Sequence, residues 1–156
     1  MTEPNAIDSL NQMYQEIIRE HHKDPRCYGE IKKPDLHAEG YNPLCGDQIA
    51  VDINLNPQKD AVAQCRFRGA GCSICIASAS MMCEEIEGKK IEEVKTQIQD
   101  FRDLMQGKAC PASIDGDLVA LGGVRRFPVR IKCALLPWTT LKDAVESESK
   151  KNEEAV

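Results

Sequence analysis

Aromatic side chains are scarce in this 156-residue chain, at 4% of residues, and it contains no long apolar run. A membrane-spanning helix needs about 20 consecutive apolar residues, so we expect no contact with a membrane. Basic residues are not in excess either, because 20 Lys and Arg stand against 25 Asp and Glu. The resulting net charge of −5 argues against nucleic-acid binding, which normally requires a basic face. The core must therefore consist mainly of aliphatic and small side chains.

The first residues, 1–5, lack the basic segment and the apolar stretch of a secretory signal. We therefore expect a cytoplasmic protein. In that reducing compartment, the eight cysteines fit free thiols or metal ligands better than a disulfide framework. The length suits one domain, which we place at residues 1–156, with flexible ends at about 1–5 and 147–156.

Hydrophobic periodicity predicts a helix, then antiparallel strands, then further helices. The predicted strands lie near 36–38, at 49–55 and at 61–68, and the predicted helices at 7–24, 73–86, 91–105, 114–121 and from 128 through 145. Segregated elements of this kind imply an α+β domain with helices packed on one face of a sheet. We expect a small antiparallel sheet of two to three strands covered by about five helices.

Three short segments place a cysteine in a setting unsuited to an apolar core residue. The segments are Asn42–Asp47, Gly69–Ser73 and Arg130–Cys133. Together they offer three thiolates and one carboxylate, a complete tetrahedral ligand set for zinc or the anchor of an iron–sulfur cluster. A metal–thiolate site is therefore the leading interpretation.

Each segment has a functional and an incidental explanation. If the chain is extended from Cys45 to Asp47, thiol and carboxylate point to one side; otherwise this is a turn with an incidental cysteine. Cys72 follows a glycine-rich turn at the start of a helix, where unpaired N–H groups and the helix dipole favour a thiolate. Cys133 follows an arginine and a lysine, which also favour the thiolate, although a core cysteine on an amphipathic helix fits this segment too.

Two other constellations compete with this interpretation. Cys72–Cys75 is a C-x-x-C at a predicted helix N-terminus, typical of dithiol redox sites, but almost nothing after it predicts the strands of a thioredoxin-like sheet. His21, His22, Cys27 and His37 offer metal ligands, but their spacing matches no zinc module. A surface histidine pair at a helix end explains the first two better.

The chain resembles the SufU family, part of the IscU/NifU-like superfamily of iron–sulfur cluster assembly proteins. The segments that carry the resemblance are Asn42–Asp47, Gly69–Ile74 with Ala77–Met82, and Phe127–Cys133. The similarity extends from about residue 10 to residue 145. Scaffold-type IscU proteins carry a histidine directly before their last cysteine, where this chain has Lys132. This departure favours the SufU branch.

The resemblance implies zinc bound by Cys45, Asp47, Cys72 and Cys133. It also implies a pyridoxal-phosphate-dependent cysteine desulfurase as partner, which hands over sulfur as a persulfide, and a downstream iron–sulfur assembly scaffold. In the family, a desulfurase histidine is thought to take a metal position and free the thiol that corresponds to Cys45. Cys45 would then be the catalytic sulfur acceptor, and Arg130 would steady its thiolate.

The resemblance thus implies a zinc-dependent sulfurtransferase that serves iron–sulfur cluster assembly. The alternative is a non-catalytic scaffold on which a [2Fe–2S] cluster is assembled with the same ligands, and a third possibility is a purely structural zinc module. Four further cysteines fall outside the family's ligand pattern, and they are Cys65, Cys75, Cys83 and Cys110.

Overall fold

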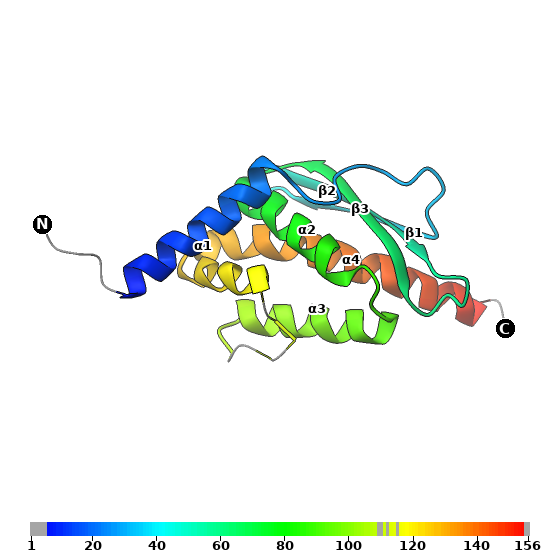
Figure 1. The fold of residues 1–156 in the computed structure, drawn as a ribbon. Helices are drawn as coiled ribbons and strands as arrows, with labels where there is room; N and C mark the ends of the chain where they lie inside the picture. Colours follow the sequence, from blue (N-terminus) through cyan, green and yellow to red (C-terminus); the bar gives the residue numbers. More distant parts are fainter. Residues whose placement is uncertain (1–5, 109–110, 112, 115, 155–156) are drawn as a thin grey trace, which may run out of the picture.

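Figure 1 shows the computed structural model, which describes residues 6–108, 111, 113–114 and 116–154. Its helices are α1 (Ala6–Lys23), α2 (Ser73–Ile86), α3 (Ile91–Met105), the 3₁₀ helix η1 (Gly116–Arg126) and α4 (Pro128–Glu154), and its strands are β1 (Leu36–Asn42), β2 (Asp47–Leu55) and β3 (Val62–Ala70). The predicted α+β class, with a small antiparallel sheet and five helices, is confirmed. Cys110 lies outside the described residues. The domain bounds remain a prediction.

The sheet has three antiparallel strands in the order β1-β2-β3. Side chains alternate between the two faces of a strand, so β2 turns Ile49, Val51 and Ile53 toward the core. At the end of the β1–β2 hairpin, Asn42 pairs with Asp47. The four residues between them form the connecting turn, which brings the first cysteine segment to one end of the sheet.

Helices α2 and α4 cover one face of the sheet, α1 packs on α2 and η1, and α3 packs on α4 (Figure 1). Small side chains let α2 approach α4 closely: Ser78 Oγ donates to the Ala134 carbonyl at 2.6 Å and accepts from Trp138 Nε1 at 3.2 Å. Phe101 of α3 stacks on Trp138, with ring centroids 4.6 Å apart. Two of the few aromatic side chains therefore join α3 to α4.

His21 connects three helices from inside the protein. Its Nδ1 lies 2.8 Å from Ser80 Oγ on α2, and its Nε2 lies 2.8 Å from Asp117 Oδ2 on η1. The ring is 2% exposed, so the predicted surface position is wrong for His21, although His22 is exposed. Buried polar groups need hydrogen-bond partners, and His21 finds them on helices far away in the sequence.

The face of the sheet opposite α2 and α4 carries a buried carboxylate, Asp52. Its Oδ2 accepts from Arg68 Nη1 at 2.7 Å and from the Ile31 amide at 3.0 Å, and its Oδ1 lies 2.5 Å from His37 Nδ1. Burial raises the pKa of Asp52, but hydrogen bonds from His37, Ile31 and Arg68 outweigh it and hold the pKa below its ordinary value. Because His37 binds Asp52 and His21 binds other partners, the alternative histidine metal site does not form.

The largest differences from the predicted element boundaries are in β1, η1 and α4. β1 continues beyond residue 38 to Asn42, because β2 supplies a pairing partner along its whole length. The helix predicted at 114–121 is a 3₁₀ helix that begins at Gly116 and runs through Gly122 and Gly123. α4 continues past Val145 to Glu154. Within the described part of the chain, no helix has the length and apolar character needed to cross a bilayer.

Replacing Gly40 by alanine should destabilise the contact between β1 and α4. A Cβ at this position would lie 2.2 Å from Thr140 Oγ1 and 3.0 Å from Leu136 Cδ1. Overpacking of this kind costs about 1–3 kcal/mol, so Gly40→Ala should lower the free energy of unfolding by that amount in urea titrations. Gly123→Ala is the matched control, because a Cβ added at Gly123 would meet nothing within 4 Å. Equal stability of the two variants would contradict this account.

The stabilising effect of Asp52 should disappear in acid. A carboxyl group whose pKa is lowered by folding stabilises the native state above its unfolded pKa, ordinarily 3.8, and loses that effect as pH falls through the folded pKa. Asp52→Asn should therefore cost about 2 kcal/mol at pH 7. The difference in free energy of unfolding between Asp52→Asn and the unmodified protein should shrink below about pH 4. Chemical denaturation at a series of pH values measures this, and a constant difference down to pH 3 would contradict it.

Candidate metal centre

The turn between β1 and β2 brings Cys45 beside Asp47. Gly46 has φ +71°, a left-handed conformation that glycine adopts readily. The extended geometry considered for this tripeptide is therefore wrong, and a tight turn aims the two side chains at the same region. Cys45 is half-buried, whereas Asp47, the first residue of β2, is fully buried.

The Asp47 carboxylate also holds the N-terminus of α2. Its Oδ1 accepts a hydrogen bond from the Cys72 amide at 2.8 Å, and its Oδ2 lies 4.0 Å from Cys72 Sγ. Cys72 lies at the start of α2, where the sequence predicted a helix to begin; it is the N-cap residue, and its own side chain makes no capping bond. Gly71 is needed for this approach, because a Cβ there would lie 2.7 Å from Asp47 Oδ1. The positive end of the helix dipole favours a negative charge at this position.

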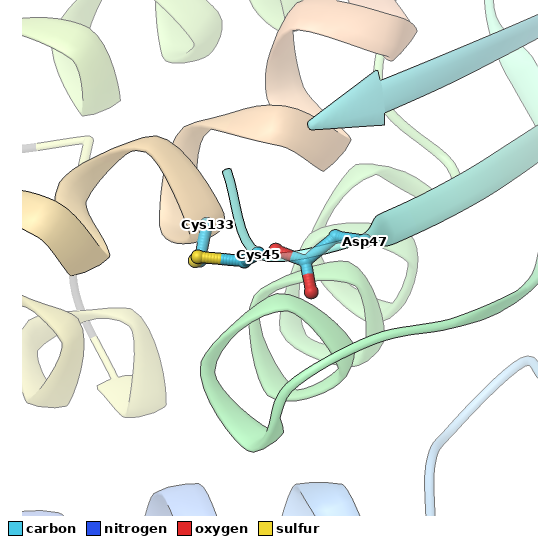
Figure 2. Close-up of side chains that lie close together, drawn as sticks. All are labelled: Cys45, Asp47 and Cys133. Atoms are coloured by element: carbon cyan, nitrogen blue, oxygen red, sulfur yellow. The ribbon is translucent and has the colours of Figure 1, made fainter. Parts of the chain in front are cut away.

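Cys133 approaches from α4, and Figure 2 shows its sulfur beside Cys45 and the Asp47 carboxylate. The Sγ atoms of Cys133 and Cys45 are 3.2 Å apart. Cys133 is fully buried, and Asn42 Nδ2 donates to its sulfur at 3.8 Å. The thiol thus lies at the inner side of the site, with a polar donor behind it.

Burial raises the pKa of the Cys133 thiol above its ordinary value, and hydrogen bonds with Cys45, Asp47 and Cys72 act in the same direction. Arg130, one of the two cations expected to favour a Cys133 thiolate, does interact with this sulfur, but burial has the larger effect on the pKa of the thiol. The other cation, Lys132, has its side chain exposed to solvent. A bound cation would reverse this preference, because metal coordination deprotonates a thiol.

Arg130 lies on the solvent side of the same group. The Cys72 side chain, followed by that of Cys133, raises the pKa of the Arg130 guanidinium above its ordinary value. The arginine is exposed and faces both sulfurs one turn ahead of Cys133 on α4. This position suits the predicted role of steadying a thiolate, which remains a prediction.

The donor atoms of Cys45, Asp47 and Cys133 all lie within 4.8 Å of one another, and within the described part of the chain they are the one such group found. Donors around a tetrahedral zinc lie about 3.3–3.8 Å apart, given bonds of about 2.0–2.3 Å. Two thiols and a carboxylate gathered this closely fit zinc with small adjustments. Cys72 lies beside Asp47 but outside this group, so it would have to move inward to become the fourth ligand.

Two residues near the site were not among the predicted ligands. Asn42 belongs to the first cysteine segment, but nothing in the sequence indicates that its amide reaches a sulfur on α4. Cys75 is fully buried one turn after Cys72, and burial raises its pKa, with Asp47 adding to the shift. Spacing on a helix indicates that Cys75 is near Cys72. Its burial, however, makes it unlike the exposed thiol of a redox C-x-x-C.

The protein-family model described as the NifU-like N terminal domain matches residues 13–155 of this chain. The zinc-dependent sulfurtransferase SufU of Bacillus subtilis (strain 168) is 43% identical over 141 residues, covering 90% of this chain and 94% of that protein. The iron-sulfur cluster assembly scaffold protein IscU of Streptococcus pyogenes serotype M1 is 34% identical over 142 residues, covering 90% and 87%. This chain therefore belongs to the family of the NifU-like N-terminal domain.

Solved structures agree with this assignment. A crystal structure from Fervidobacterium islandicum AW-1, described as a candidate iron-sulfur cluster assembly scaffold protein for the SUF system, has a TM-score of 0.79 and 31% identity, covering 86% of this chain and 98% of that one. The N-terminal part of a NifU-like protein from Brucella abortus has a TM-score of 0.78 at 19% identity, which supports the fold alone. The resemblance to SufU and the IscU/NifU-like fold are both confirmed.

Proposed function

We propose that this protein is a cytoplasmic, zinc-dependent sulfur acceptor that takes persulfide sulfur from a pyridoxal-phosphate-dependent cysteine desulfurase for iron–sulfur cluster assembly. The observation that carries the proposal is the position of Cys45. It is a half-buried thiol on a hairpin turn, and its sulfur lies 3.2 Å from the buried Cys133. The 43% identity to a zinc-dependent sulfurtransferase supports the same activity.

Cys45, Asp47, Cys72 and Cys133 would hold the zinc ion. Bound there, zinc would keep the thiols deprotonated and shielded from oxidation. The protein supplies the orientation: Gly46 turns Cys45 inward, and Gly71 leaves room for the Asp47 carboxylate. Because Asp47 is already fixed by the Cys72 amide at 2.8 Å, one of its oxygens is held in place before any metal binds.

Sulfur transfer would begin with the Cys45 thiolate. It attacks the outer sulfur of the desulfurase persulfide, a new S–S bond forms on Cys45, and the partner's cysteine leaves as a thiolate. Cys45 suits this role better than Cys72 or Cys133, because a turn can move outward while thiols at a helix end or within a helix are held by the helical backbone. The guanidinium of Arg130 would stabilise the negative charge of the sulfur during the exchange.

The surroundings of the site offer a contact area for the desulfurase. Leu44 precedes Cys45 on the turn, and Phe127 and Val129 flank the start of α4; these three apolar side chains are 68%, 61% and 66% exposed. Apolar groups exposed beside a reactive thiol are typical of a protein–protein interface. The desulfurase, and a downstream assembly scaffold that would receive the sulfur, are the partners that the family resemblance implies.

A scaffold on which a [2Fe–2S] cluster is assembled is the second candidate. Relatives named as IscU scaffolds at 34% identity favour it, and cysteine thiolates are the usual ligands of such a cluster. The protein as isolated distinguishes the candidates: colourless with bound zinc supports the acceptor, and brown with iron and sulfide supports the scaffold.

The four ligands should differ in how much zinc they retain. A carboxylate is the weakest donor of the set toward a borderline-soft metal, so Asp47→Asn should keep appreciable zinc, while Cys72→Ser and Cys133→Ser should lose most of it. The asparagine can still accept the bond from the Cys72 amide, which preserves the cap of α2. Elemental analysis of purified protein measures the zinc content, and Cys65→Ser, which is away from the site, is the matched control. Complete zinc loss in Asp47→Asn would overturn this ranking.

Persulfide should form on Cys45. We expect that incubating the zinc-loaded protein with a cysteine desulfurase and cysteine adds about 32 Da to the peptide that contains Cys45, because persulfide formation adds one sulfur atom. The protein should also raise desulfurase turnover, and Cys45→Ser should not. Persulfide mainly on Cys75, or full stimulation by Cys45→Ser, would rule out the proposed transfer.

A further inference from the structure

A second pair of thiols lies away from the metal centre. Cys65 of β3 and Cys83 of α2 are both fully buried, and their Sγ atoms are 2.9 Å apart. Cys65 is paired across the sheet with Ile53, whereas Asp47 begins the same strand β2. Ile53 and Asp47 are six residues apart on β2, which places them about 20 Å apart along the strand. The pair is therefore independent of the proposed function.

The groups around this pair do not make it a metal site. The nearest carboxylate is Glu87, whose Oε1 already accepts from the Cys65 amide at 3.0 Å and from Arg66 Nη1 at 2.7 Å. A third thiol, Cys27, is half-buried and lies 3.9 Å from the same Glu87 oxygen. Within the described residues, the cluster of donor atoms that could hold a metal is at Cys45 and not here.

The backbone holds the two sulfurs in contact. β3 is paired with β2 on one side and with the segment around Cys27 on the other, where the Phe67 amide donates to the Cys27 carbonyl at 3.1 Å. Cys83 lies within α2, which is enclosed by the sheet, α1 and α4. A disulfide has an S–S bond of about 2.03–2.05 Å, so the Cys65 and Cys83 sulfurs need to approach by less than about 1 Å.

We propose that Cys65 and Cys83 form an oxidisable dithiol, which closes into a disulfide that fastens α2 to β3. Two S–H bonds break, one S–S bond forms, and two electrons and two protons pass to a two-electron thiol oxidant. A small-molecule disulfide is one such oxidant, and it is reduced to two thiols. The bond links a strand to the helix whose N-terminus carries Cys72, so it would hold α2 in place from its opposite end.

The reaction should be slow at neutral pH. Burial raises the pKa of Cys83 well above its ordinary value, and the hydrogen bond with Cys65 adds to the shift. The thiolate is the reactive form, so the reduced pair resists brief exposure to oxidant. Burial likewise raises the pKa of Cys27 to about 11, so this thiol does not compete efficiently.

Peptide mapping of the unmodified protein tests the bond directly. The protein as isolated is incubated for hours with diamide, which takes up two electrons and two protons, then denatured in the presence of an alkylating agent and digested with trypsin without reduction. We expect peptide 60–66, which contains Cys65, joined to peptide 69–89, with fragmentation placing the bond on Cys83. Recovery of Cys65 and Cys83 as alkylated thiols, or a bond from Cys65 to Cys27, would overturn the proposal.

Thermal melting gives a second measurement. Cys65 and Cys83 are 18 residues apart in the sequence. A disulfide that closes this loop restricts the unfolded chain, so diamide should raise Tm by several degrees, and dithiothreitol should reverse the rise. The melts use a Cys45→Ser background, because Cys45 Sγ is only 3.2 Å from Cys133 Sγ. In that background, adding Cys83→Ala should abolish the shift. Adding Cys75→Ala, which removes another buried thiol of the same helix, should preserve it, and the opposite pattern would contradict the proposal.

Discussion

The hydrogen bond from the Cys72 amide to the Asp47 carboxylate is the contact on which the arrangement of the site depends. A fully buried carboxylate is stable only if its charge is compensated, and here the N-terminus of α2 supplies a donor 2.8 Å away. The bond ties the start of β2 to the start of α2, two elements that the chain separates by a whole hairpin. It thereby places Cys45, which precedes Asp47 on the turn, beside the helix that carries Cys72.

The packing of α4 completes this arrangement. Gly40 lets α4 lie directly on β1, and Cys133 then reaches the hairpin turn from the other side. The resulting group is asymmetric, because Cys133 is held in a buried helix while Cys45 lies on a half-buried turn. Thiols of the same chemistry therefore differ in their access to solvent, an asymmetry that the proposed sulfur acceptor would use.

Two helices, α2 and α3, were predicted at their observed bounds, Ser73–Ile86 and Ile91–Met105. The apolar residues of α3 recur with helical spacing, α2 follows a glycine-rich turn with a run of small and apolar residues, and a glycine lies two residues after the end of each helix, so local chemistry is sufficient. Elements whose form depends on partners were predicted less well. β1 is longer because β2 pairs with it, and η1 runs through Gly122 and Gly123, two residues that do not favour a helix.

The sequence by itself determined the types of donor, the order of helices and strands, and the family to which the chain belongs. Tertiary structure alone decided which donors meet: Cys45, Asp47 and Cys133 form a close group, while Cys72 stays beside it. Tertiary structure also buried groups that local patterns place at the surface, such as His21, and brought the Cys65 and Cys83 sulfurs into contact. The physical reason is that these contacts join residues far apart in the chain, and their distances depend on how the helices pack on the sheet rather than on neighbouring residues.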